Sequence, residues 1–189
     1  MDEPAGTDHS GLREALKRVA SALKAGGVPF ALTGGYGLWA RGAPEPEHDV
    51  DLVVALSDVE EAVRVLAGSG LEVIRPPEDW LFKVSTDGVI VDVLHRHARQ
   101  PASAELLQRA DEIEVLSVEM PVLPATDLLA SKLIALAEHF CDFTKLLPAA
   151  RAVREQVDWA RLRDEVAEND YALAFLFLAD RLGISPPAS

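Results

Sequence analysis

Residues 33–56 read TGGYGLWARGAPEPEHDVDLVVAL, and two aspartates, Asp49 and Asp51, stand in the otherwise aliphatic run at the end of this stretch. Side chains on a strand alternate between its two faces, so we expect both aspartates to point one way while Val50 and Leu52 point into a core. A buried carboxylate without a partner is destabilising unless its pKa shifts. We therefore expect Asp49 and Asp51 to face something positive.

A third carboxylate lies in a similar setting. Residues 81–94, LFKVSTDGVIVDVL, predict a β-hairpin with Asp87-Gly88 at its turn and with Asp92 alone among the aliphatic residues of the return strand. Three carboxylates that converge from adjacent strands make a site for a hard divalent cation such as Mg²⁺. Two such ions about 3.5–4 Å apart can clamp the attacking and leaving oxygens of a phosphoryl displacement.

A pair of glycines precedes these aspartates. Residues 28–33, VPFALT, predict a buried strand that runs directly into Gly34 and Gly35, and a short helix is expected after them. Backbone N–H groups at glycines can approach a phosphate closely because no Cβ intervenes. The glycine pair therefore predicts a phosphate contact beside the carboxylates.

This combination resembles the DNA polymerase β-like nucleotidyltransferase superfamily: a glycine pair, an Asp-x-Asp motif after thirteen intervening residues, and a third aspartate on a later strand. The resemblance implies that the carboxylates bind Mg²⁺ or Mn²⁺ and carry catalysis, and that an NTP is the substrate. The metal ligands and catalytic residues implied are Asp49, Asp51 and Asp92. The residues implied to bind the triphosphate are Thr33, Gly34, Gly35 and Lys132.

Lys132 enters through a second resemblance. The segment 124–147, PATDLLASKLIALAEHFCDFTKLL, is similar to the tail of abortive-infection toxin nucleotidyltransferases and related minimal enzymes. In those enzymes a helix carries a lysine, which Lys132 matches, and a nearby segment carries an Arg/Lys-Asp pair. Asp142 matches the aspartate of that pair, although Phe140 and Cys141 precede it here instead of a basic residue. Those toxins usually read Arg-x-Thr-x-Asp up to the first aspartate, whereas residues 45–49 here read EPEHD. The alternative for Lys132 is a side chain that extends along an apolar helix to reach water.

The pattern of the chain changes near residue 100. Residues 112–123 predict a second, smaller β excursion, and helical periodicity continues from residue 125 onward. The predicted fold class is α+β: a nucleotidyltransferase-fold mixed β-sheet with flanking helices, followed by a C-terminal helical lobe. We expect the α/β core over residues 1–100 and the β excursion with the helical lobe over residues 101–189. Ser10 and Ser57 are expected to cap the helices that follow them.

The composition narrows the possible partners. The net charge of −13 repels polyanions at long range, which argues against an extended nucleic-acid surface. No apolar stretch approaches the roughly 20 residues that a membrane helix needs, and residues 1–10 predict no signal peptide. The single cysteine, Cys141, fits a reducing compartment, so we expect a cytoplasmic protein without membrane association.

Three functions remain open at this stage. The leading hypothesis is a metal-dependent nucleotidyltransferase that moves NMP from an NTP to a hydroxyl-bearing acceptor and releases pyrophosphate, with a small-molecule acceptor favoured over nucleic acid. The second is the toxin of a toxin–antitoxin pair that modifies tRNA ends, with a cognate antitoxin as partner. The third is a protein of the same fold that binds a nucleotide or a partner without turnover.

Overall fold

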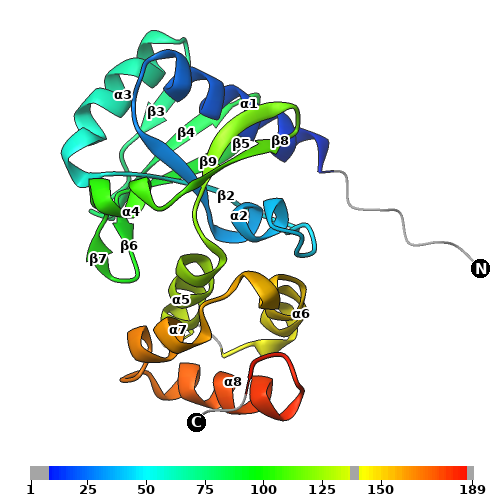
Figure 1. Ribbon diagram of the computed structural model, residues 1–189. Coiled ribbons are helices and arrows are strands. Elements are labelled where there is room, and N and C mark those ends of the chain that lie inside the picture. Colours follow the sequence, from blue (N-terminus) through cyan, green and yellow to red (C-terminus); the bar gives the residue numbers. More distant parts are fainter. Residues whose placement is uncertain (1–8, 137–140, 187–189) are drawn as a thin grey trace, which may run out of the picture.

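The computed structural model describes residues 9–136 and 141–186, and it confirms the predicted α+β class (Figure 1). The helices of the N-terminal half are α1 (Ser10–Ala25), α2 (Gly34–Ala40), α3 (Val59–Gly68) and α4 (Ala104–Gln108). Those of the C-terminal half are α5 (Ala125–Ala135), α6 (Phe143–Val153), α7 (Trp159–Glu165) and α8 (Asp170–Arg181). Short 3₁₀ turns, η1 (Leu56–Asp58) and η2 (Arg154–Gln156), precede α3 and α7.

One mixed sheet forms the centre of the molecule. Its seven strands run in the order β3-β4-β5-β2-β1-β9-β8. Their bounds are β1 (Phe30–Thr33), β2 (Val50–Val54), β3 (Glu72–Ile74), β4 (Leu81–Thr86), β5 (Val89–Leu94), β8 (Asp111–Val115) and β9 (Val118–Val122). A small separate hairpin consists of β6 (Arg96–His97) and β7 (Gln100–Pro101). The predicted hairpin over 81–94 is confirmed as β4 and β5, which pair antiparallel from Leu81–Leu94 to Thr86–Val89.

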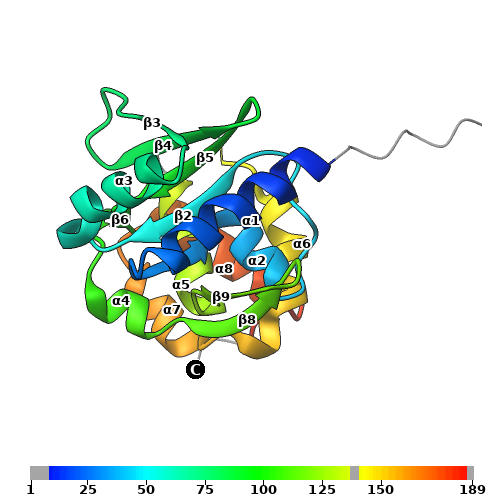
Figure 2. The ribbon, with the colours of Figure 1, turned by 90° about the horizontal axis from the view of Figure 1, so that it is seen from above.

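The sheet separates two hydrophobic clusters. On one face, α1 and α3 pack against strand residues such as Val50, Leu52 and Val54, all fully buried. On the other face, Ala31 and Val53 belong to one hydrophobic cluster with buried residues of α5 to α8. Figure 1 shows α1 and α3 above the sheet and the C-terminal helices below it, and Figure 2 shows α1 lying across the strands. Odd-numbered residues of β2 therefore face the helical lobe.

The helical lobe is joined closely to the sheet. Strand β9 runs parallel to β1, with Leu32 opposite Val122, and the Leu123 N–H donates to the Leu32 carbonyl at 3.1 Å. Only Leu123 and Pro124 separate β9 from α5. The β excursion predicted over 112–123 is therefore part of the main sheet, because β9 fills the position next to β1.

The predicted helix caps are wrong in detail. Ser10 is the first residue of α1 rather than its cap, and the N-cap residue, His9, makes no side-chain capping hydrogen bond within the described part of the chain. The turn η1 displaces the start of α3 to Val59, so the Ser57 hydroxyl donates to the Asp58 carboxylate instead of capping α3. Among the described residues, no helix combines the length and the apolar character that crossing a membrane requires.

Candidate functional site

A row of polar residues crosses the middle of the sheet. Strand β2 runs parallel to β5 and brings Asp51 opposite Asp92. On the other side of β2, Thr33 of β1 is opposite Asp51, and on the other side of β5, Lys83 of β4 is opposite Asp92. Directly opposed residues on neighbouring strands project from the same face. Thr33, Asp51, Asp92 and Lys83 therefore line one face of the sheet, the face toward the helical lobe.

Asp51 fits against the backbone of Gly34, which follows β1 directly. Gly34 has φ +61°, and a Cβ at this position would lie 1.9 Å from Asp51 Oδ2. A side chain at residue 34 would therefore suffer both the left-handed backbone conformation and a collision with the carboxylate. A Cβ on Gly35 would in turn lie 2.8 Å from the Pro46 Cβ. Both glycines are thus required by packing, and their contact with phosphate stays a prediction.

Asp49 reaches the site by a different route from the one its spacing predicts. It precedes β2, is exposed, and has φ +59°, a left-handed conformation that Asp tolerates better than most residues. Strand alternation therefore does not set the direction of its side chain. Asp49 instead lines a pocket that opens beside the strand end.

The electrostatics of the row centre on Asp51. Burial, with a smaller contribution from the negative charges of Asp92 and Asp49, raises the pKa of Asp51 to about 6. The ammonium group of Lys132 is the main influence in the opposite direction, with a smaller one from Lys83. Asp51 therefore lies within electrostatic reach of both other aspartates and of two lysines. The two ammonium groups do not fully offset the effect of burial and of the neighbouring negative charges on its carboxylate.

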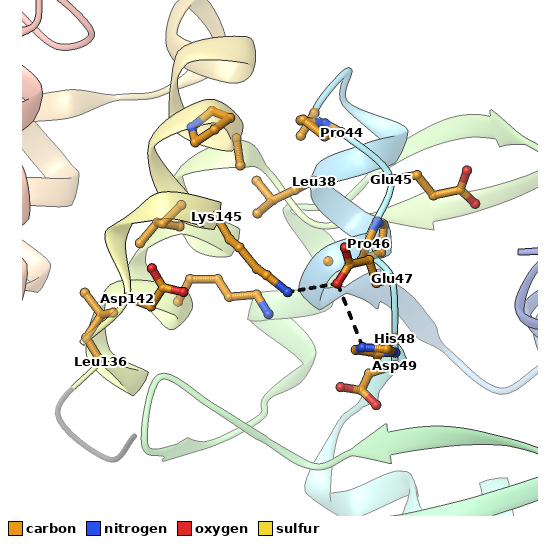
Figure 3. Close-up of a pocket in the computed structure, with 16 residues that line it drawn as sticks. Leu38, Pro44, Glu45, Pro46, Glu47, His48, Asp49, Leu136, Asp142 and Lys145 are labelled. Atoms are coloured by element: carbon orange, nitrogen blue, oxygen red, sulfur yellow. Dashed lines mark hydrogen bonds and ion pairs between the residues drawn. The ribbon is translucent and has the colours of Figure 1, made fainter. Parts of the chain in front are cut away.

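The pocket beside Asp49 has a volume of about 460 Å³ and lies between the sheet side and the helical lobe. Its walls come from α2, the loop 43–49, α5 and α6, and Lys132 of α5 lines it together with Asp49. Figure 3 shows Lys145 extending from α6 to Glu47 of the loop, where Nζ and Oε2 are 3.1 Å apart. His48 Nε2 lies 3.9 Å from the same Glu47 oxygen.

Asp142 has a structural task at this pocket. It is the N-cap of α6, and its carboxylate accepts a hydrogen bond from the Thr144 N–H at 2.9 Å. The Thr144 hydrogen bonds hold the pKa of Asp142 below its usual value. Asp142 therefore stays ionised and adds a negative charge to the pocket wall.

The loop that carries Asp49 is anchored by contacts that sequence reasoning missed. Arg13 of α1 holds Glu45 with two hydrogen bonds, one of them from Nε to Oε1 at 2.8 Å, and the buried Tyr36 hydroxyl donates to the same oxygen at 3.1 Å. Arg13 also lies over the Trp39 ring at 5.7 Å. The Arg13 guanidinium keeps the pKa of Glu45 low, and burial raises the pKa of Tyr36. These side chains fix the loop from which Asp49 reaches the pocket.

A second polar cluster holds the helical lobe together. Asp127 of α5 is 2% exposed and accepts hydrogen bonds from Arg109 at 2.5 Å and from Arg161 at 2.6 Å. Its other oxygen, Oδ2, has no hydrogen-bond partner among residues 9–136 and 141–186. Burial lowers the pKa of the neighbouring His97, which lines a pocket with Asp127 and Arg109. The cluster ties α4 and α7 to α5, the helix that carries Lys132.

The sequence profile of a family described as "uncharacterised nucleotidyltransferase" matches residues 5–182, nearly the whole chain. The chain belongs to this nucleotidyltransferase family. A comparison with curated protein sequences found no match.

Solved structures agree on the fold of this nucleotidyltransferase. A crystal structure of ANT(2″)-Ia in complex with adenylyl-2″-tobramycin is 16% identical, with a TM-score of 0.63 over 89% of this chain and 98% of that one. A nucleotidyltransferase-like protein from Paracoccidioides brasiliensis is 11% identical, with a TM-score of 0.55 over 92% of this chain and 88% of that one. At these identities the likeness shows the nucleotidyltransferase fold.

The donor groups of this nucleotidyltransferase suit a hard divalent cation. Carboxylate oxygens are the ligands that Mg²⁺ and Mn²⁺ prefer. The raised pKa of Asp51 means that its ionised form is disfavoured, and a nearby cation would stabilise that form. Among residues 9–136 and 141–186, however, no group of three or more His, Cys, Asp or Glu side chains is gathered closely enough to hold a metal ion. The carboxylate of Asp92 is instead engaged by Lys83, a residue that sequence reasoning missed.

Proposed function

We propose that this nucleotidyltransferase moves a nucleoside monophosphate from an NTP to a hydroxyl group of a small-molecule acceptor in a reaction that depends on Mg²⁺ or Mn²⁺. The observation that supports this most directly is the opposition of Asp51 and Asp92 on one sheet face, with Lys132 in electrostatic reach of Asp51. Carboxylates within electrostatic reach of an ammonium group can hold a triphosphate together with a cation.

The aspartates and Lys132 would bind different parts of the metal–nucleotide complex. Asp49, Asp51 and Asp92 would supply the oxygen ligands of the cation, which when bound neutralises and orients phosphate oxygens. Lys132 would bind the phosphates from the helical lobe, opposite Thr33, Gly34 and Gly35.

The transfer itself needs mainly positioning. The acceptor hydroxyl oxygen would bond to the α-phosphorus, the bond from that phosphorus to the pyrophosphate oxygen would break, and Asp92 would take the hydroxyl proton. This assignment of the proton follows the family resemblance. It gives Asp92 a role that Asp51, pressed against Gly34, is less free to perform.

The charge of the pocket favours a cationic acceptor. Four acidic residues line it against two lysines: Glu45, Glu47, Asp49 and Asp142 against Lys132 and Lys145. The whole chain also carries a net charge of −13, which disfavours a nucleic-acid acceptor such as a tRNA end. ANT(2″)-Ia, whose crystal structure holds an adenylylated tobramycin, has the same fold. We therefore propose a small polyamine-bearing alcohol, such as an aminoglycoside, as acceptor.

We also propose that the protein acts in the cytoplasm. The single cysteine fits a reducing compartment, and NTPs are abundant there. The test is incubation with each α-labelled NTP, with Mg²⁺, Mn²⁺ or EDTA, and with a panel of aminoglycosides, neutral sugars and tRNA. We expect the label to appear on a cationic small molecule only when metal is present.

Two variants calibrate this assay. Asp51→Asn should abolish transfer, whereas Glu112→Gln, which removes an exposed charge from β8, should leave it intact. Labelling of tRNA would instead support the toxin hypothesis. Binding of NTP without transfer to any acceptor would support a non-catalytic protein and overturn the proposal.

A further inference from the structure

Lys83 forms the end of the polar row on the sheet. Its Nζ donates to Asp92 Oδ1 at 2.9 Å, across directly opposed positions of β4 and β5. The side chains are only 35% and 23% exposed, so this pair is partly shielded from water. Figure 2 shows β4, β5 and β2 as neighbouring strands, which brings Lys83 two strands away from Asp51.

The ammonium group of Lys83 engages one oxygen of the carboxylate that would bind a metal ion at Asp92. Asp92 Oδ1 accepts a hydrogen bond from the Lys83 ammonium group at 2.9 Å. One of its lone pairs is therefore already used by a cation. A Mg²⁺ ion demands oxygen ligands at about 2.0–2.1 Å in nearly ideal octahedral geometry. A cation bound by Asp92 would therefore have to displace Lys83 or accept its positive charge as a close neighbour.

We propose that Lys83 takes the place of a second metal ion, so that this enzyme binds one divalent cation together with its nucleotide. Lys83 holds Asp92, so the ligand set proposed above narrows to Asp49 and Asp51, which hold the single cation. The absence of a three-carboxylate cluster among the described residues agrees with this division. The inference rests on the proposed function, since it concerns the cation that accompanies the NTP.

Native mass spectrometry with Mn²⁺ and an α,β-methylene NTP tests the inference without any turnover. We expect one Mn²⁺ per nucleotide-bound wild-type molecule and two per molecule of Lys83→Met, which keeps the length of the side chain and removes its charge. Lys83→Arg keeps a positive charge and should bind one. Lys17→Met, which removes a lysine from α1 where it pairs with Glu14, is the matched control and should match the wild type.

The outcomes separate the inference from the proposed function. Two Mn²⁺ ions on the wild-type complex would overturn the inference and leave the metal-dependent transferase intact, and this count does not depend on whether any variant folds. One Mn²⁺ on Lys83→Met would also overturn it, because Lys83 would then not be what excludes the second ion. A wild-type complex that binds nucleotide without Mn²⁺ would overturn both.

Discussion

Replacing Asp51 by Asn should stabilise the protein when no metal is present. Asn has nearly the same shape as Asp, but it removes the charge that burial and the other two aspartates disfavour. The pKa of Asp51 rises from 3.8 to about 6 in the folded state, net of the attraction from both lysines. At about 1.4 kcal/mol per pKa unit this corresponds to at most about 3 kcal/mol of stability at neutral pH, because Asp51 is half-buried rather than sealed.

The stabilisation by Asp51→Asn should appear only as the pH rises. A carboxylate with a raised folded-state pKa binds its proton more tightly in the folded protein than in the unfolded chain. Folded wild type is therefore penalised progressively as pH rises from about 4 to about 6, and the full penalty applies above that range. The difference in unfolding free energy between Asp51→Asn and wild type should be near zero at pH 4 and constant above pH 7.

Urea denaturation at a series of pH values between 4 and 8, in EDTA, measures this difference directly. Glu112→Gln on strand β8 is the matched control, since it removes an exposed acidic charge and should show no comparable pH profile. Adding Mg²⁺ with an NTP analogue should stabilise wild type more than Asp51→Asn. A variant that is less stable than wild type at pH 8 in EDTA would refute the reasoning, because Asp51 would then be stabilising in its charged form.

Three further substitutions test other parts of the site. Gly34→Ala should lower unfolding stability by more than about 1–2 kcal/mol, because a left-handed conformation and contact with Asp51 oppose a Cβ, and calorimetry would measure this. Lys132→Met should weaken binding of a non-hydrolysable NTP by roughly tenfold in isothermal titration, because one charge-assisted contact with the phosphates is lost. Equal affinities would mean that Lys132 does not contact the nucleotide. Asp127→Ala should cost about 2–3 kcal/mol in chemical denaturation, since its two arginine partners would lose their buried acceptor.

Local patterns predicted the strands well. The alternation of buried residues and the Asp87-Gly88 turn located β4 and β5, and the aliphatic run after Asp49 located β2. The same turn also fixes the register of the two strands. A two-residue turn sets Thr86 opposite Val89, and counting back along both strands sets Lys83 opposite Asp92. The partner of Asp92 could therefore be found from the sequence.

Other features depend on contacts between distant parts of the chain. Nothing local indicates that β9 pairs with β1, because that register is set by packing on both sheet faces. Asp49, with its left-handed conformation, ends a loop whose Glu45 is held by Arg13 of α1, a residue distant in the sequence. The buried role of Asp127 was also hidden, since an acidic residue near a helix start is common on exposed helices.

The pairing of β1 with β9 has a consequence for the newly made chain as it leaves the ribosome. β1 and β2 are synthesised early, but β1 keeps an open edge until Val122 has been made. The face that carries Ala31 and Val53 stays uncovered even longer, until the C-terminal helices exist. An unpaired edge beside an apolar face invites association with other chains. A fragment that ends near residue 100 should therefore aggregate rather than fold, and synthesis of this enzyme should depend on chaperones until its last helices emerge.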